Sequence, residues 1–195
     1  MISLELIRAG TGCSEAAAAR YQTPLSAAAD KYLINTQTRI AAWLANIGHE
    51  SGSLIYTTEL WGPTPVQKGY DQREDLGNTK PEAIQFAKAH GDTPGHWWRG
   101  HGLIQTTGYS NHLATGTALG LDLLNHPELL SLPEHAAMSA AYFFSTHGCL
   151  KFADAGDFDG VCDLVNRGHK TTKVGDALGY ARRLYFYQSA LKVGG

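Results

Sequence analysis

Hydrophobic positions along this chain recur mostly at helical spacing. After Thr36, apolar residues repeat every three or four positions at Ile40, Trp43, Leu44 and Ile47. This repeat is typical of one buried helix face. Thr36 is a suitable N-cap, and Gly48 and Gly52 mark the end of the pattern. The pattern therefore predicts a strong amphipathic helix between Thr36 and this glycine pair.

Other segments also have a helical pattern, and one has a strand pattern. Helices are predicted over residues 15–20, capped by Ser14, and over 26–33, 81–90, 133–146, 158–165 and 176–191. Pro24 is expected to break or restart the first of these. Residues 54–60 are β-branched in the middle and predict a short strand, and residues 67–78 predict a polar loop. We therefore expect a mainly α fold with a small β-hairpin region, forming a single domain over 1–195 with a small lobe over 54–96.

Composition is consistent with one globular domain. The chain has 195 residues, of which 43% are hydrophobic, enough for a core. Glu5 and Arg8 interrupt the apolar stretch at the N-terminus, whereas a secretory signal needs a longer unbroken run. No segment approaches the ~18 apolar residues of a membrane span. We expect a monomer made in the cytoplasm without stable membrane insertion. If its substrate lies outside the membrane, another protein must release it.

Charge is distributed unevenly. The formal net charge of −2 argues against a nucleic-acid partner. Residues 166–195, however, contain six basic side chains against one acidic side chain, Asp176. A basic face could attract an anionic wall polymer or lipid head groups. A solvated helix surface is the alternative for the lysines.

The three cysteines, Cys13, Cys149 and Cys162, are odd in number and widely spaced, which predicts buried reduced thiols. No metal site or cofactor is expected. A zinc amidase of the His-Glu-x-x-His type would need histidine where Ser53 stands. A Cys–His peptidase pairing Cys149 with His169 stays open, although nothing local marks that cysteine as reactive.

Two glutamates are candidates for acid–base chemistry. Glu50 ends the strong helix in the sequence His-Glu-Ser-Gly, where the negative end of the helix dipole favours a protonated carboxyl. Glu59 follows nine positions later, in the predicted strand. Inverting glycosidases hold two carboxylates roughly 6.5–9.5 Å apart to leave room for a water. The alternative is a pair of ordinary surface glutamates.

Residues 97–111 are rich in groups that recognise sugars. The segment reads Trp-Trp-Arg-Gly-His-Gly-Leu-Ile-Gln-Thr-Thr-Gly-Tyr-Ser-Asn. Tryptophans stack on pyranose faces, amides and hydroxyls bond sugar hydroxyls and acetamides, and glycines allow close backbone approach. The alternative is a core segment with two buried tryptophans.

Together these motifs resemble glycoside hydrolase family 19, the chitinase class with a lysozyme-like fold. The resemblance rests on His-Glu-Ser-Gly, a following glutamate, and Arg-Gly-x-Gly-Leu-Ile-Gln-x-Thr-Gly-x-x-Asn. The opening Leu-Ile-Arg-Ala-Gly-Thr-Gly-Cys and the late Val-Asn-Arg-Gly also match, and the likeness covers most of the chain. It is nearest to the phage endolysins of the family, which cleave peptidoglycan.

The resemblance implies a role for each matching residue. It assigns Glu50 as general acid, Glu59 as the base that activates water, and Thr107 as the residue that helps to hold that water. It assigns Gln105, Asn111, Asn166 and Arg183 to the substrate-binding residues, and the stacking of tryptophan on sugar rings adds Trp98 to this set. Within this set, Arg183 is expected to support the second carboxylate, with Arg182 as the alternative.

Three positions depart from the family pattern, and the absence of cysteine-linked loops bears on which polymer is the substrate. His101 stands where Arg is usual, His112 where Tyr is usual, and Arg167 replaces the middle glycine of the late turn. The region 62–97 lacks the cysteine-linked loops of plant chitinases, which favours a wall-lysing enzyme. The expected activity is inverting hydrolysis of the β-1,4 bond between N-acetylmuramic acid and N-acetylglucosamine. A chitinase and a noncatalytic wall-binding module are the alternatives. The implied site of action is the periplasmic cell wall, after a separate holin-type protein has permeabilised the membrane.

Overall fold

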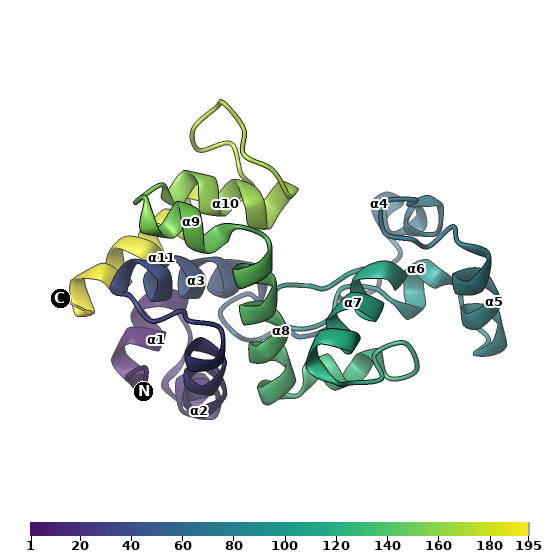
Figure 1. Cartoon of the computed structure of the whole chain (residues 1–195), viewed down its shortest axis with the longest axis horizontal. Helices are drawn as coiled ribbons and strands as arrows, with labels where there is room; N and C mark the ends of the chain where they lie inside the picture. Colours follow the sequence, from purple (N-terminus) through teal and green to yellow (C-terminus); the bar gives the residue numbers. More distant parts are fainter. Residues whose placement is uncertain (195) are drawn as a thin grey trace.

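The computed structural model describes residues 1–194 and shows two helical lobes on either side of α8 (Figure 1). The elements run, in chain order, over Leu4–Thr11 (α1), Glu15–Lys31 (α2), Gln37–Glu50 (α3), Pro65–Lys68 (α4), Tyr70–Gln72 (η1), Pro81–Ala89 (α5), Pro94–Trp97 (α6), Tyr109–Leu119 (α7), Pro127–Ser131 (η2), Pro133–Thr146 (α8), Cys149–Asp154 (α9), Phe158–Arg167 (α10) and Tyr180–Val193 (α11). The prediction of a mainly α fold is confirmed. None of the helices within residues 1–194 is long and apolar enough to span a bilayer.

The larger lobe is built around α3. This helix contacts α1, α8, α9, α10 and α11, and Trp43, Leu44 and Ile47 on it are completely buried. The predicted N-cap is confirmed, because the Thr36 side chain accepts a hydrogen bond from the Arg39 backbone N–H. The first and last helices, α1 and α11, both lie in this lobe (Figure 1). Its core therefore fixes the end of α3, where the first candidate carboxylate lies.

The smaller lobe holds α4 to α7 and has its own small group of buried residues. α6 contacts α4, η1 and α5, while α7 packs on α8. Its hydrophobic cluster consists of the buried residues Ala83, Ala87, Trp98 and Tyr109. Trp98 and Tyr109 lie beyond residue 96, the last residue of the small lobe predicted from the sequence.

The predicted β-hairpin is not confirmed, and the predicted break at Pro24 is wrong. Only isolated bridges occur near the expected hairpin among the described residues, and they join His101 to Thr58 and to Thr106. The backbone coils before Thr58, since Leu54 has a positive φ of 63°. α2 runs unbroken through Pro24 to Lys31. Buried side chains lie on both sides of Pro24, so their packing outweighs the hydrogen bond that proline cannot donate.

Several element boundaries also differ from the prediction. The segment expected as a polar loop over 67–78 begins with the end of α4 and contains η1, and α4 starts with a capping box between Thr64 and Gln67. α11 begins at Tyr180 and not at residue 176. The segment that would have extended it forms the loop between α10 and α11, which projects from the larger lobe at the top of Figure 1. In this loop the Leu178 backbone N–H donates to Asn166 Oδ1 at 3.0 Å.

Candidate active site

The first carboxylate is held by a buried arginine. Glu50 is the last residue of α3, and its Oε1 accepts a hydrogen bond from Nη2 of Arg183 on α11. Arg183 is completely buried. It also donates to Asn46 Oδ1 at 2.7 Å and to the Leu178 carbonyl at 3.1 Å. The guanidinium thus joins α3, α11 and the preceding loop at the carboxylate.

This contact corrects the role expected for Arg183. The sequence assigned it to the second carboxylate, yet it is bonded to Glu50. The alternative, Arg182, is exposed and donates to Ser53 Oγ at 2.9 Å. Neither arginine bonds Glu59. The reason is the register of α11, which turns Arg183 inward against α3.

The histidine before Glu50 is wedged against the start of α11. A Cβ added to Gly179 would lie 1.9 Å from His49 Cε1, so only glycine fits there. His49 Nδ1 is buried without a hydrogen-bond partner in residues 1–194. Burial, reinforced by nearby Arg183, lowers the pKa of His49. The imidazole is therefore neutral and acts as a spacer beside the carboxylate.

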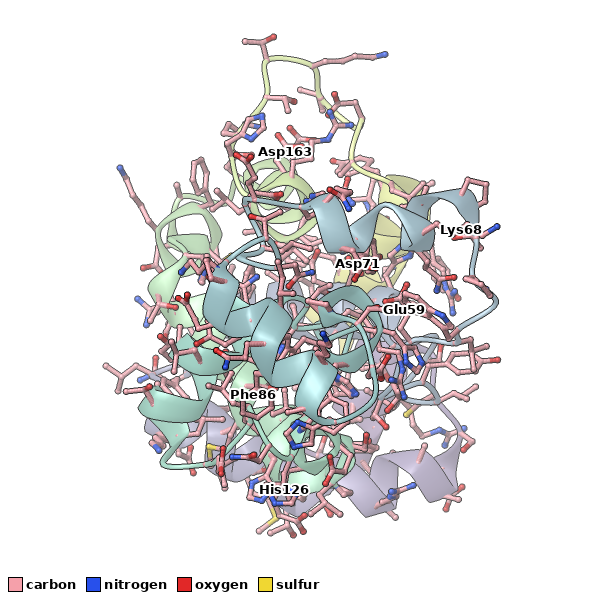
Figure 2. All side chains as sticks on the ribbon, turned by 90° about the vertical axis from the view of Figure 1, so that its right-hand side faces the viewer. Glu59, Lys68, Asp71, Phe86, His126 and Asp163 are labelled. Carbon is pink, nitrogen blue, oxygen red and sulfur yellow. The ribbon has the colours of Figure 1, made fainter. Side chains whose placement is uncertain are left out.

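The second carboxylate, Glu59, is held by three uncharged donors. Its Oε1 accepts from Gln67 Nε2 at 2.9 Å and from the Tyr70 hydroxyl at 3.2 Å. Its Oε2 accepts from the Gly100 N–H at 3.0 Å. Figure 2 views this lobe end-on, with Glu59 beside the segment that carries Lys68 and Asp71. Burial and the neighbouring carboxylate raise the pKa of Tyr70, so its hydroxyl stays a donor.

The sequence reasoning missed Gln67 and Tyr70. A signal for Gln67 was present, because Thr64 and Gln67 have the spacing of a capping box. Gln67 is buried, and its amide also donates to the Leu60 carbonyl at 2.8 Å. No local pattern predicted that Tyr70 would reach Glu59.

A cavity of about 440 Å³ brings four of the expected site residues together. They are Gln105, Thr107, Asn111 and Asn166. Neither glutamate lines the cavity, and Trp98 and Arg183 do not line it either. The cavity therefore extends from α7 past α8 to α10, and the glutamates lie outside its lining.

Local hydrogen bonds orient the polar lining. Thr107 Oγ1 donates to the Gln105 carbonyl at 2.9 Å, and Asn111 Nδ2 donates to the Thr107 carbonyl at 2.8 Å. Gln105 has a positive φ of 56°, and its amide donates to the Gly102 carbonyl at 2.9 Å. Each amide has further donor or acceptor capacity, which suits the recognition of hydroxyl and acetamide groups.

The expectation that Trp98 binds substrate is wrong in this structure. Its side chain is completely buried and packs edge-on against Tyr109, with ring centroids 4.9 Å apart. The adjacent Trp97 is half-buried and donates from Nε1 to the Leu124 carbonyl. The alternative reading, in which these tryptophans belong to the core, holds for Trp98.

The cysteines are buried and free, as predicted. Burial raises the pKa of Cys149 to about 12. A thiolate is the nucleophilic form, so this thiol is unreactive at neutral pH. The peptidase alternative loses its nucleophile.

The sequence matches the family described as chitinase class I, glycoside hydrolase family 19, over residues 14–153. The chain belongs to glycoside hydrolase family 19. This confirms the resemblance seen in the sequence motifs. Nearness to the phage endolysins stays a prediction.

Two curated relatives of this family 19 chain show how much of their length it covers. An endochitinase of Arabidopsis thaliana is 31% identical over 105 residues, covering 54% of this chain and 31% of the relative. An inactive chitinase-like protein of Hevea brasiliensis is 34% identical over 116 residues, covering 57% of this chain and 34% of the relative. The chain thus spans about a third of the length of these relatives.

Solved structures confirm the lysozyme-like fold of family 19. A bacterial family 19 chitinase superposes with a TM-score of 0.69 at 22% identity, covering 100% of this chain and 95% of that chain. Chitinase C from Streptomyces griseus HUT6037 gives a TM-score of 0.67 at 20% identity, covering 98% and 76% of the two chains. At these identities the likeness is one of fold.

Proposed function

We propose that this protein is a glycoside hydrolase that cleaves a β-1,4-linked amino-sugar polymer, with Glu50 as general acid and Glu59 as general base. The family motifs assign Glu50 as the acid and Glu59 as the base, and the observation that supports two different roles is the different set of hydrogen-bond donors at each carboxylate. Glu50 is bonded to a buried guanidinium, whereas Glu59 is bonded only by uncharged donors. Two carboxyl groups in different surroundings are suited to different proton-transfer roles.

In the proposed reaction Glu50 delivers a proton to the glycosidic oxygen as the bond to the anomeric carbon breaks. Its Oε1 stays bonded to Arg183, so the proton is carried on Oε2, which accepts no hydrogen bond from the described residues 1–194. Glu59 removes a proton from a water, and the resulting oxygen attacks the anomeric carbon from the opposite face. Thr107 helps to hold that water. The configuration at the anomeric carbon is inverted.

The substrate we propose is bacterial peptidoglycan, cut between N-acetylmuramic acid and N-acetylglucosamine. Support comes from the endolysin-like motifs and from the basic C-terminal segment. Chitin is the second candidate, because the curated relatives include endochitinases. Both substrates carry the acetamide groups that Gln105, Asn111 and Asn166 are suited to bind.

Mass spectrometry of digested peptidoglycan, with reduction of the new sugar ends, tests the substrate. New reducing N-acetylmuramic acid ends, with little cleavage of a chitin oligomer, are the expected result. Efficient cleavage of chitin with intact peptidoglycan would mean that the same two-glutamate mechanism acts on chitin. Release of peptide stems alone would refute a glycosidase.

Two variants test the roles of the glutamates. Glu50→Gln and Glu59→Gln should each abolish cleavage and retain binding, while Glu82→Gln on the exposed start of α5 should change neither. Proton NMR of the first product should show the α-anomer, which an inverting enzyme releases from a β-glycoside. Cleavage by Glu50→Gln at the wild-type rate would remove the assignment of the acid. Binding without any cleavage by the wild-type protein would instead favour a noncatalytic wall-binding module.

In this proposal the protein acts on the cell wall after a separate membrane-permeabilising protein releases it. Co-expression with a holin-type protein should cause lysis, and expression alone should not. Lysis without any permeabilising protein would refute the need for that partner.

A further inference from the structure

The charged side chains that line the cavity are all basic. Arg73 approaches it from the smaller lobe and Arg167 from the end of α10. None of the residues lining this cavity, within the described 1–194, is an aspartate or a glutamate. The remaining lining is made of amides, hydroxyls, apolar side chains and one imidazole, His147. A ligand in the cavity therefore meets positive charge and no negative lining residue.

Both arginines have aspartate partners, and both keep unused donors. Arg73 bonds Asp75 through Nε and Nη2, which leaves Nη1 without a partner in residues 1–194. Arg167 contacts the Asp176 carboxylate through Nη1 at 3.1 Å and its carbonyl through Nη2. This leaves Nε of Arg167 without a partner in the same range. A guanidinium offers five N–H donors, so neither side chain is saturated.

The two ion pairs are exposed enough for a ligand to reach them. The side chains of Arg73 and Arg167 are 48% and 37% exposed. The Arg73–Asp75 pair is exposed on both sides and contributes little to stability, whereas Asp176 is only 18% exposed. A ligand carboxylate can therefore replace Asp75 at little cost, and at Arg167 it can bind the free Nε beside Asp176.

We infer that Arg73 and Arg167 form a carboxylate-binding subsite on the rim of this cavity, which selects glycans that carry acidic substituents. The inference rests on the proposed function and names the chemistry that distinguishes the two candidate polymers. Muramic acid bears a lactyl group that leads to a peptide stem with free carboxylates, whereas chitin is uncharged. Arginine is suited to this ligand because its fork matches a carboxylate.

The sequence also favours a special role for Arg167. It follows Asn166, which lines the same cavity. The subsite therefore combines an amide suited to the acetamide with an adjacent guanidinium suited to the acidic substituent.

Binding to the inactive Glu50→Gln protein tests the subsite. The probes are a soluble muropeptide chain with free stem carboxylates, the same chain with those carboxylates amidated, and a chitin oligomer of equal sugar number. Adding Arg73→Gln and Arg167→Gln together should weaken binding of the free-acid muropeptide by about tenfold or more, since each charge-assisted contact is lost. Binding of the other two probes should change less than about twofold. Raising the salt concentration should weaken free-acid binding more in the parent than in the double variant.

Control variants separate charge from structure. Arg8→Gln removes an exposed arginine that also faces a carboxylate, Glu15, far from the cavity lining, and it should leave all three affinities unchanged. Arg167→Lys keeps the charge without the fork and should give an intermediate loss. Because Arg167 also bonds the loop before α11, thermal melting must show that Arg167→Gln stays folded.

The outcomes distinguish the subsite from the proposed function. Equal weakening for all three probes, or no weakening for any, would overturn the subsite even if wild-type protein cleaves peptidoglycan. Selective loss of free-acid binding would support the subsite. It would do so even if the wild-type protein cleaves neither polymer, a result that would refute only the proposed function.

Discussion

Replacing Glu50 tests whether the carboxylate has a structural role as well as a catalytic one. Glu50→Ala would leave the Arg183 guanidinium, whose side chain is 1% exposed, without its counter-charge. Breaking a buried ion pair from one side costs about 3–5 kcal/mol. The Glu50 side chain is 22% exposed, so water can partly replace it and the loss should be about 3 kcal/mol. Glu50→Gln keeps an acceptor for Arg183 and should lose only about 1 kcal/mol.

Urea unfolding followed by circular dichroism measures these losses, with the m-value checked for constancy. Both variants should lose all glycosidase activity, so the difference between them lies in stability alone. Glu82→Ala, at an exposed site, should match the wild type in both measurements. If Glu50→Ala were as stable as the wild type, the buried guanidinium would not depend on this carboxylate, and the reasoning would be refuted.

Three further predictions concern two buried histidines, the glycine beside His49 and a buried cysteine. Burial, the largest cause in each case, lowers the pKa of His101 to about 3 and of His112 to about 4. The unfolded state therefore binds more protons below pH 6.5, and stability should fall by roughly 1.4 kcal/mol per pH unit per histidine from pH 6.5 towards pH 4. A urea midpoint that is flat over this range would contradict it. Gly179→Ala should lower stability and activity, because the added Cβ would meet the ring of His49. Gly156→Ala has open space around it and should be destabilised only by backbone strain, by about 1–2 kcal/mol. Equal melting temperatures for the two variants would refute the close contact between Gly179 and His49. Burial raises the pKa of Cys149 to about 12, so this thiol should react with a thiol reagent at pH 8 only after unfolding. Cys149→Ala should keep the activity of the wild type. Loss of activity in a folded variant would favour the Cys–His peptidase.

The helices with strong local signals could be predicted from the sequence. The helix after Thr36 has both a capping residue and a repeated apolar face, and it forms with the predicted start. α8 begins at Pro133, where proline at the first turn is favourable. In these segments local propensity and burial agree, so the sequence pattern is sufficient.

The rest depended on contacts between distant residues. Pro24 lies inside α2 because the apolar residues on both sides pack into one core, which no local rule reports. The strand expected at Glu59 is absent, because that segment is ordered by single contacts with residues near Gly100. Arg183 reaches Glu50 across 133 positions of sequence, and the motif alone could not show which carboxylate it would meet.

Glu50 and Glu59 accept hydrogen bonds from different parts of the fold. The donors to Glu59 come from α4, from η1 and from the backbone at Gly100. The donor to Glu50 comes from α11 in the larger lobe. Because the two glutamates have no side-chain donor in common, a shift of one lobe against the other would change their separation and leave the hydrogen bonds of each intact. In the proposed mechanism this separation decides whether a water fits between base and sugar, so we expect the proposed reaction to depend on the packing of α7 against α8 as well as on the residues at the carboxylates.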